Sequence, residues 1–103
     1  MSVLMNLAIF PTDKGDSVSG YVAQVIDFIR QSGASYQLNS MGTTIETETM
    51  ADALAIINGA YEILEPLASR VYCNVTIDIR KGQSNRMKHK VESVEKIIGE
   101  VSK

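Results

Sequence analysis

The sequence predicts an α+β fold, with a four-stranded antiparallel sheet, two helices on one face and a further helix at the C-terminus. Three observations predict it. Some segments alternate apolar and polar residues as strands do, three others repeat apolar residues at helical spacing, and turn or capping residues separate them. The chain of 103 residues is long enough for a single core, so we expect one domain spanning residues 1–103.

The N-terminal segment predicts the first strand. Residues 3–10 alternate between two sets of side chains, and the uniformly apolar set is expected to face the core. This set comprises Val3, Met5, Leu7 and Ile9. The other set is mixed and contains the polar residue Asn6. Pro11 ends the strand, because proline has no N–H to donate to a sheet.

The next apolar pattern predicts a helix. Apolar residues recur at helical spacing between Val18 and Ile29, and Tyr21 falls on the same side, where we expect it in the core. Ser17 has the position of a helix N-cap, and Gly33 has that of the glycine that ends a helix. The first helix is therefore expected between these two residues.

A hairpin and a second helix follow. Residues 34–38 and 43–47 read as short strands joined by turn-forming residues. Thr49 is the expected N-cap of the second helix, and Pro66 marks its end. The apolar side of this helix is expected to comprise Met50, Leu54, Ile57, Tyr61 and Leu64, supported by Ala53 and Ala60.

The C-terminal third predicts a long strand and a third amphipathic helix. Residues 70–80 alternate cleanly, and Cys73 falls on the apolar side, where we expect an inert buried thiol. Residues 87–101 repeat apolar side chains at helical spacing. The order βαββαβ plus one helix is that of a ferredoxin-like fold, with the strands in the order 4-1-3-2.

The strand at residues 43–47 contains an unusual carboxylate. If Ile45 points into the core, Thr44 and Glu46 lie together on the opposite face, because strand side chains alternate. Glu is disfavoured in strands, and a covered carboxylate needs a hydrogen-bond donor or a cation. We expect a small ligand to supply it. Residues expected on the same face are Asn6, Thr44, Glu46, Asn74 and Thr76.

That face would be left open by the first two helices. It also carries apolar residues, and contiguous mixed surfaces of this kind usually mark interaction sites. Either the third helix or a second subunit could cover it. We favour self-association, for which symmetric dimers are the usual solution.

Composition excludes several classes of function. The net charge of −2 and the lack of a large basic cluster argue against nucleic-acid binding. No segment is long and apolar enough to span a membrane, and the single cysteine fits a reducing compartment, so we expect a cytoplasmic protein. His89, the only histidine, has no second ligand at metal-binding spacing, so we expect no metal site.

Several motifs, in the same order through nearly the whole chain, resemble those of the small thiamine-binding, YkoF-like proteins. The most specific is Met41-Gly42-Thr43-Thr44-Ile45-Glu46. Others are Phe10-Pro11, Lys14-Gly15, Ser17-Val18-Ser19, Tyr21-Val22-Ala23, Arg70-Val71, Ile77-Asp78-Ile79-Arg80 and Lys90-Val91-Glu92-Ser93-Val94. The resemblance implies a ferredoxin-like subunit, a homotetramer built as a dimer of dimers, and binding of thiamine or its hydroxymethylpyrimidine half.

The polar residues of the chain are compatible with such a ligand. A 4-aminopyrimidine offers an amine donor and two ring-nitrogen acceptors, which require a small set of paired groups. Glu46 could accept from the amine, and an aromatic side chain could stack on the ring. The expected ligand-binding residues are Asn6, Ser17, Ser19, Tyr21, Thr43, Thr44 and Glu46.

The expected function is therefore non-catalytic binding of a small molecule, at the sheet face or a subunit interface, without a cofactor. One alternative is an enzyme of thiamine-pyrimidine metabolism that uses Glu46, although no nucleophile–base pair, carboxylate dyad or metal cluster can be assembled from the sequence. Another is a regulatory or structural oligomeric domain that binds a different effector. Purely structural roles are also open: Glu46 could be a surface carboxylate paired with Arg80 or a lysine, and Ser17 could serve only as a helix cap.

Overall fold

The computed structural model describes all 103 residues and confirms the predicted ferredoxin-like α+β fold with a C-terminal helix. Its elements are β1 (Ser2–Pro11), α1 (Ser19–Gln31), β2 (Ser35–Asn39), β3 (Gly42–Thr47), α2 (Met50–Leu64), the short 3₁₀ helix η1 (Glu65–Leu67), β4 (Val71–Arg80) and α3 (Arg86–Ile98). The strands form one antiparallel sheet in the order β2-β3-β1-β4, which is the predicted order read from the other edge.

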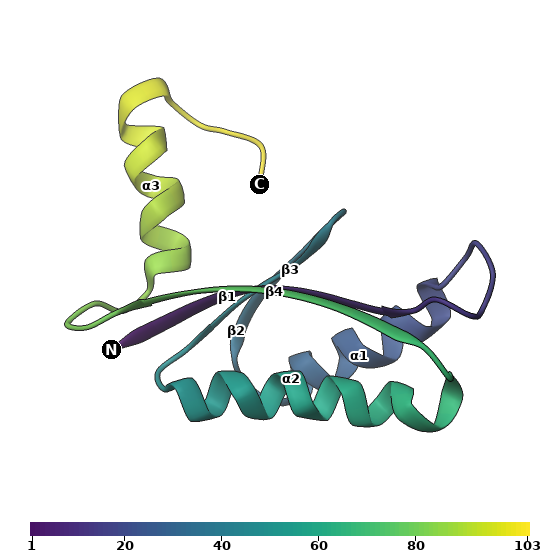
Figure 1. Cartoon of the computed structure of the whole chain (residues 1–103). Helices are drawn as coiled ribbons and strands as arrows, with labels where there is room; N and C mark the ends of the chain where they lie inside the picture. The colour runs from purple at the N-terminus through teal and green to yellow at the C-terminus, as the bar shows by residue number, and fades with distance from the viewer.

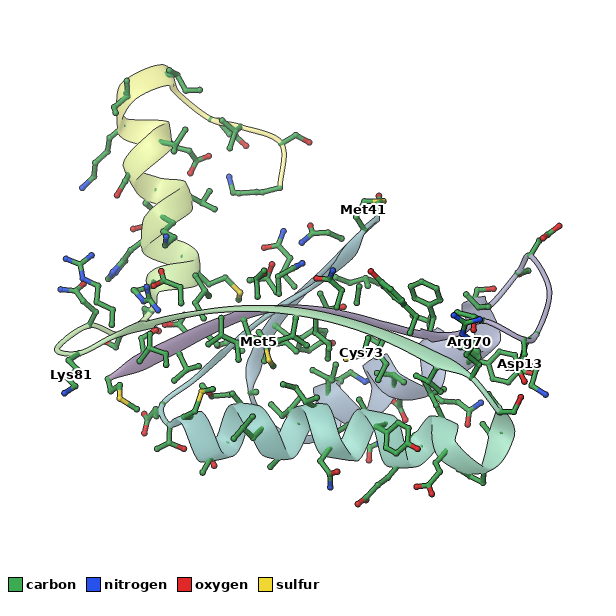
Figure 2. All side chains as sticks on the ribbon, in the orientation of Figure 1. Met5, Asp13, Met41, Arg70, Cys73 and Lys81 are labelled. Carbon is green, nitrogen blue, oxygen red and sulfur yellow. The ribbon has the colours of Figure 1, made fainter.

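The core lies between one face of the sheet and the helices α1 and α2, which run beneath it (Figure 1). Strand alternation decides which residues enter it. The predicted inward set of β1 is buried, and Met5 points from the sheet toward the helices (Figure 2). On β3, Thr43, Ile45 and Thr47 face the core, whereas Thr44 and Glu46 lie on the other face, as predicted.

The ends of the two core helices agree with the sequence in part. Thr49 caps α2, because its hydroxyl accepts a hydrogen bond from the Asp52 amide at 3.0 Å. Gly33 has a φ of +81° just after α1, a conformation that favours glycine. The predicted N-cap Ser17 is wrong: α1 begins at Ser19, and the capping residue Val18 has no side-chain oxygen to offer. That first turn is exposed to water, which can satisfy its free amides.

The buried side of α2 agrees with the prediction in part. Ala53, Ala60 and Leu64 are buried as predicted, and Ile56 is buried with them, whereas the expected core residues Leu54 and Tyr61 are 51 % and 43 % exposed. The reason is the close approach of α1. A Cβ at Gly59 would lie 2.2 Å from the ring of Phe28, so this side of α2 must face α1. The small alanines then face the sheet, and the larger residues turn to the far flank.

The third helix does not cover the open face of the sheet. α3 rises steeply from the sheet, and the C-terminal tail folds back beside it (Figure 1). The tail is held by Glu95, which accepts hydrogen bonds from the Val101 amide at 3.1 Å and from Lys103 Nζ at 2.7 Å. One of the two expected covers for the open face is therefore absent within the chain.

The expectation that Cys73 is buried is wrong, because β4 forms one edge of the sheet. The cysteine is on the helix-facing side of β4, as predicted, but its side chain is exposed. α2 packs mainly against β1 and β3, so the underside of the edge strand is only partly covered. The thiol is therefore accessible to solvent.

No helix of this structure combines the length and the apolar character that crossing a bilayer would require.

Candidate functional site

Glu46 lies on the open face of the sheet at the foot of α3. Its Oε2 accepts hydrogen bonds from Ser2 Oγ at 2.5 Å and from the Arg86 amide at 2.9 Å. Its Oε1 accepts from the Met87 amide at 3.0 Å. The two amides belong to the first turn of α3, whose N–H groups have no partner within the helix. The donors that the sequence led us to expect from a ligand thus come from the chain itself.

Arg86, which was not among the residues predicted from the sequence, is only 4 % exposed. Its Nε donates to Ser2 Oγ at 3.0 Å, and its Nη1 donates to Asp78 Oδ2 at 2.8 Å. Its Nη2 donates to the carbonyl oxygens of Ser2 at 3.0 Å and Asp78 at 2.5 Å. A buried guanidinium is tolerated only when its donors are paired in this way.

Ser2, Glu46, Asp78 and Arg86 form one hydrogen-bonded group, which we call the α3 anchor. Ser2 joins its two halves, because the hydroxyl donates to Glu46 and accepts from Arg86. The anchor ties the start of β1, the end of β3 and the end of β4 to the base of α3. A carboxylate is also favourable at this place because a helix N-terminus carries partial positive charge.

The anchor shifts the pKa of its carboxylate. Burial alone would raise the pKa of Glu46, but the hydrogen bonds from Ser2 and from the Met87 and Arg86 amides, together with the Arg86 charge, outweigh it. The pKa of Glu46 is therefore held below its ordinary value. Glu46 is charged at neutral pH and is suited to accepting hydrogen bonds rather than to donating a proton.

A signal for the anchor was present in the sequence. A carboxylate in the middle of a strand requires a partner, and the nearest basic cluster in the expected fold is the run that begins at Arg86. Spacing alone could not single out Arg86 from its basic neighbours, because burial depends on where α3 meets the sheet.

Three cavities of the structure are described by their linings, and all three border the sheet. The largest, of about 590 Å³, lies at the start of β1 between the end of α1 and the start of α2, and it is bordered by Glu46, Glu48 and Asp52. We call it the acidic cavity. The second, of about 300 Å³, lies on the open face and is bordered by Asn6, Thr44, Thr76, Asp78 and Lys90. We call it the open-face cavity.

The third cavity, of about 360 Å³, is lined mainly by apolar side chains of β1, α1 and the β2–β3 hairpin. It lies where β1 continues beyond its last pairing with β3, between Leu7 and Thr43. We call it the notch. Its lining includes Phe10, Val18 and Val22.

The seven predicted site residues therefore do not meet in one pocket. Asn6 and Thr44 are cross-strand neighbours at the open-face cavity. Glu46 borders the acidic cavity, and Thr43 lines the notch from the core side. Ser17, Ser19 and Tyr21 are sequence neighbours of the notch residues Val18 and Val22 but line none of these three cavities. The hydroxyls of Ser17 and Ser19 are exposed and 3.5 Å apart.

No group of three or more His, Cys, Asp or Glu side chains is arranged to hold a metal ion.

Comparison with known proteins links the chain to a family. Residues 5–95 match the model of a family described as thiamine-binding protein. A UPF0045 protein from Mycobacterium bovis is 34% identical over 98 residues, which cover 95% of this chain and 96% of that protein. A UPF0045 protein from Methanothermobacter thermautotrophicus is 31% identical over 83 residues, covering 80% of this chain and 84% of that protein.

Solved structures share the fold. A hypothetical protein from Methanocaldococcus jannaschii superposes with a TM-score of 0.83 at 27% identity, over 93% of this chain and 98% of that chain. A putative thiamine biosynthesis/salvage protein from Thermotoga maritima superposes with a TM-score of 0.79 at 20% identity, over 91% of this chain and 99% of that chain. At that identity, the second likeness concerns the fold alone.

Proposed function

This chain belongs to the thiamine-binding protein family, and we propose that it binds thiamine or the hydroxymethylpyrimidine moiety of thiamine without converting it chemically. Family membership supports this class of ligand. The geometry of the notch supports this cavity as the place where the pyrimidine ring binds. Its volume of about 360 Å³ falls in the range of small-molecule sites, which are mostly apolar with a few polar groups.

The observation that carries this assignment is the environment of Thr43. The residue is only 4 % exposed and lines the notch, yet its hydroxyl forms no hydrogen bond with another group of the chain. A hydroxyl at the wall of an apolar cavity is suited to fix the orientation of a polar ring, since it can both donate and accept. Phe10 borders the same cavity and offers an aromatic face to the ring.

The backbone of β1 adds a second polar feature. In an antiparallel pair, residues alternate between pointing their N–H and C=O groups toward the partner strand and away from it. The Thr12 amide donates to the Arg70 carbonyl at 2.9 Å, on the β4 side. Alternation then directs the N–H and C=O of Ile9 away from β4, to the side where β3 has ended. An adjacent donor and acceptor complement the amine and ring nitrogen of a 4-aminopyrimidine.

Of the other predicted residues, the two serines and Tyr21 lie beside notch residues, and the remaining three border other cavities. Ser17 and Ser19 stand on either side of Val18 at the mouth of the notch, where their exposed hydroxyls can meet the hydroxymethyl group or the thiazolium half of thiamine. Tyr21 stands next to Val22 and packs on the core. Asn6 and Thr44 offer a second polar site at the open-face cavity, and Glu46 borders the acidic cavity.

Calorimetry can test both the ligand and its location. The wild-type protein is titrated with thiamine, hydroxymethylpyrimidine and uracil, which lacks the amine. Heat with the first two and none with uracil is expected. Three variants each alter one cavity: Thr43→Val the notch, Thr44→Val the open-face cavity and Glu46→Gln the acidic cavity. Thr43→Val removes a hydroxyl at nearly constant shape and should weaken binding about tenfold, the worth of one neutral hydrogen bond.

Thr44→Val is the matched control, since it makes the same change one residue along the same strand. Unchanged affinity of Thr43→Val with a loss in Thr44→Val would move the site to the open face. The absence of heat with thiamine and hydroxymethylpyrimidine would overturn the ligand assignment. Product formation from either compound in the same solutions would contradict a purely binding role.

We infer that the chain assembles with itself, as a homotetramer built from two dimers. The open face carries half-exposed apolar residues such as Tyr72, and α3 leaves Val94, Ile97 and Ile98 exposed at 47 %, 83 % and 69 %. The anchor holds α3 at its first turn, and the rest of the helix stands away from its own sheet (Figure 1). A second copy offers both an uncovered sheet and an unpartnered helix, and a two-fold axis lets each copy cover the other.

Light scattering on the purified protein tests this assembly. The expected mass is that of four chains, and Ile98→Lys should lower it by placing a charge in the contact between α3 and the partner sheet. A single-chain mass for the wild-type protein would contradict the proposal.

A further inference from the structure

The two edges of the sheet differ in how well they are protected. β2 is an edge strand of five residues, whereas β4 is an edge strand of ten residues that pairs with β1 along its whole length without interruption. The outer side of β4 has no partner in the chain. Natural proteins usually shorten such an edge, bulge it, or place proline or lysine on it, because free N–H and C=O groups invite another strand.

β4 has none of these protections. Its sequence from Val71 to Arg80 contains no proline, glycine or lysine. Its one acidic residue, Asp78, points to the open face, where Arg86 Nη1 lies 2.8 Å and Lys90 Nζ 3.9 Å from the carboxylate. The edge is therefore regular, rich in residues that favour strands and free of unpaired charge at its centre.

An apolar flank of α2 accompanies this edge. Successive helix residues turn by about 100°, so Leu54, Ile57 and Tyr61 lie on the side of α2 opposite Gly59, which faces α1. Leu54 and Tyr61 are 51 % and 43 % exposed. Figure 1 shows α2 beneath β4, with α1 behind it. The flank therefore borders the half-covered underside of β4.

We propose that β4 pairs antiparallel with β4 of a second copy, which joins the two sheets and packs the two α2 flanks together. Two copies of the same strand that pair antiparallel about a two-fold axis are self-complementary. If that axis is perpendicular to the sheet, the helices of both copies lie on the same side of the joined sheet. We assign a second copy as the partner because the apolar flank of α2 then packs against the same flank of the other copy, while the free edge of β4 pairs with the other β4. Each surface is otherwise left exposed.

The Thr12–Arg70 hydrogen bond determines which groups are free for this pairing. It shows that Arg70 points its carbonyl toward β1, so alternation directs the backbone groups of Cys73, Val75 and Ile77 outward. A register centred on Asn74 places Asp78 opposite Arg70 on the open face. A register centred on Val75 would place Arg70 opposite Arg80, two like charges, and is disfavoured.

In the register centred on Asn74, Cys73, the only cysteine in the chain, can report directly on the pairing of the two β4 strands. Cys73 then lies opposite Val75 of the second copy, so the two Cys73 Cα atoms are about 8 Å apart from strand spacing and rise. That separation is too long for a disulfide and suits a short bis-maleimide. The reagent is expected to convert most of the wild-type protein into a covalent dimer, while mild oxidation is not.

Leu54→Lys should reduce this cross-linking at least tenfold, because it places two lysines against each other between the α2 flanks. Ala51→Lys is the matched control, since it adds the same charge to the exposed outer side of the same helix. Both substitute exposed residues, and circular dichroism should give both variants the wild-type spectrum. If Leu54→Lys is unfolded, Tyr61→Lys replaces it.

The outcomes separate this interface from the one formed by the open face. If both exist, light scattering gives four chains for the wild-type protein and two for Leu54→Lys. Two chains with efficient Cys73 cross-linking would retain the β4 interface and remove the open-face one. An oligomer that gives no Cys73 cross-link, or that cross-links equally in Leu54→Lys, would overturn the β4 pairing.

Discussion

The two faces of the sheet carry helices that are held by different forces. α1 and α2 lie on the face where Val3, Met5 and Ile45 are at most 1 % exposed, and burial of apolar surface holds them there. α3 meets the other face at the anchor, where Glu46 and Arg86 bind its first turn. Apolar burial has no direction, so α1 and α2 lie along the sheet. Hydrogen bonds have direction, so α3 is held at one end and stands away from it.

The largest expected effect is on the apolar side. Leu64→Ala removes a side chain that is fully buried between α2 and the sheet, and it should lower the free energy of unfolding by about 2–5 kcal/mol. Urea denaturation monitors the change. Met41→Ala is the control: Met41 is 88 % exposed at the tip of the β2–β3 hairpin (Figure 2), so its loss should cost less than about 0.5 kcal/mol. Equal losses would contradict the apolar account of this face.

A smaller and more local effect is expected on the polar side. Arg86→Met removes the cation from the anchor and should lower the local stability of α3 by about 2 kcal/mol, the worth of hydrogen bonds to a charged group. Amide hydrogen exchange should then be about thirtyfold faster in α3 and unchanged in α1 and α2. Arg80→Met, an exposed arginine at the end of β4, is the matched control. Equal exchange in all three helices would mean that α3 is not held separately.

The smallest expected effect is a pH dependence confined to α3. Because the folded protein lowers the pKa of Glu46 from its ordinary value of 4.5, the stabilisation is complete above that value and is lost as the pH falls through the folded pKa. Exchange of the α3 amides should therefore increase on acidification before the core unfolds. Glu46→Gln should abolish this pH dependence, and its persistence in that variant would assign it to another group.

Strand parity could be predicted from the sequence, and the helix contacts could not. Counting by twos from Ile45 placed Thr44 and Glu46 on the open face, because alternation is a local property of any strand. The predicted buried side of α2 was wrong at Leu54 and Tyr61, because the contact of Gly59 with Phe28 depends on how two helices meet.

The candidate site divides in the same way. Glu46 could be recognised as a carboxylate that needs donors, but the identity of those donors could not. Ser2 and Arg86 are far from it in sequence, and they reach it only when the sheet and α3 are assembled. Thr43 and the end of the β1–β3 pairing likewise define the notch only in the folded chain.

The amino-acid sequence alone determined the order of strands and helices, the face on which each strand residue lies and the family of the protein. These depend on periodicity and on motifs that are close in the chain. The tertiary structure decided how α3 is anchored, which flank of α2 is exposed and where cavities form. Those features depend on contacts between residues distant in sequence, whose distances no local pattern specifies.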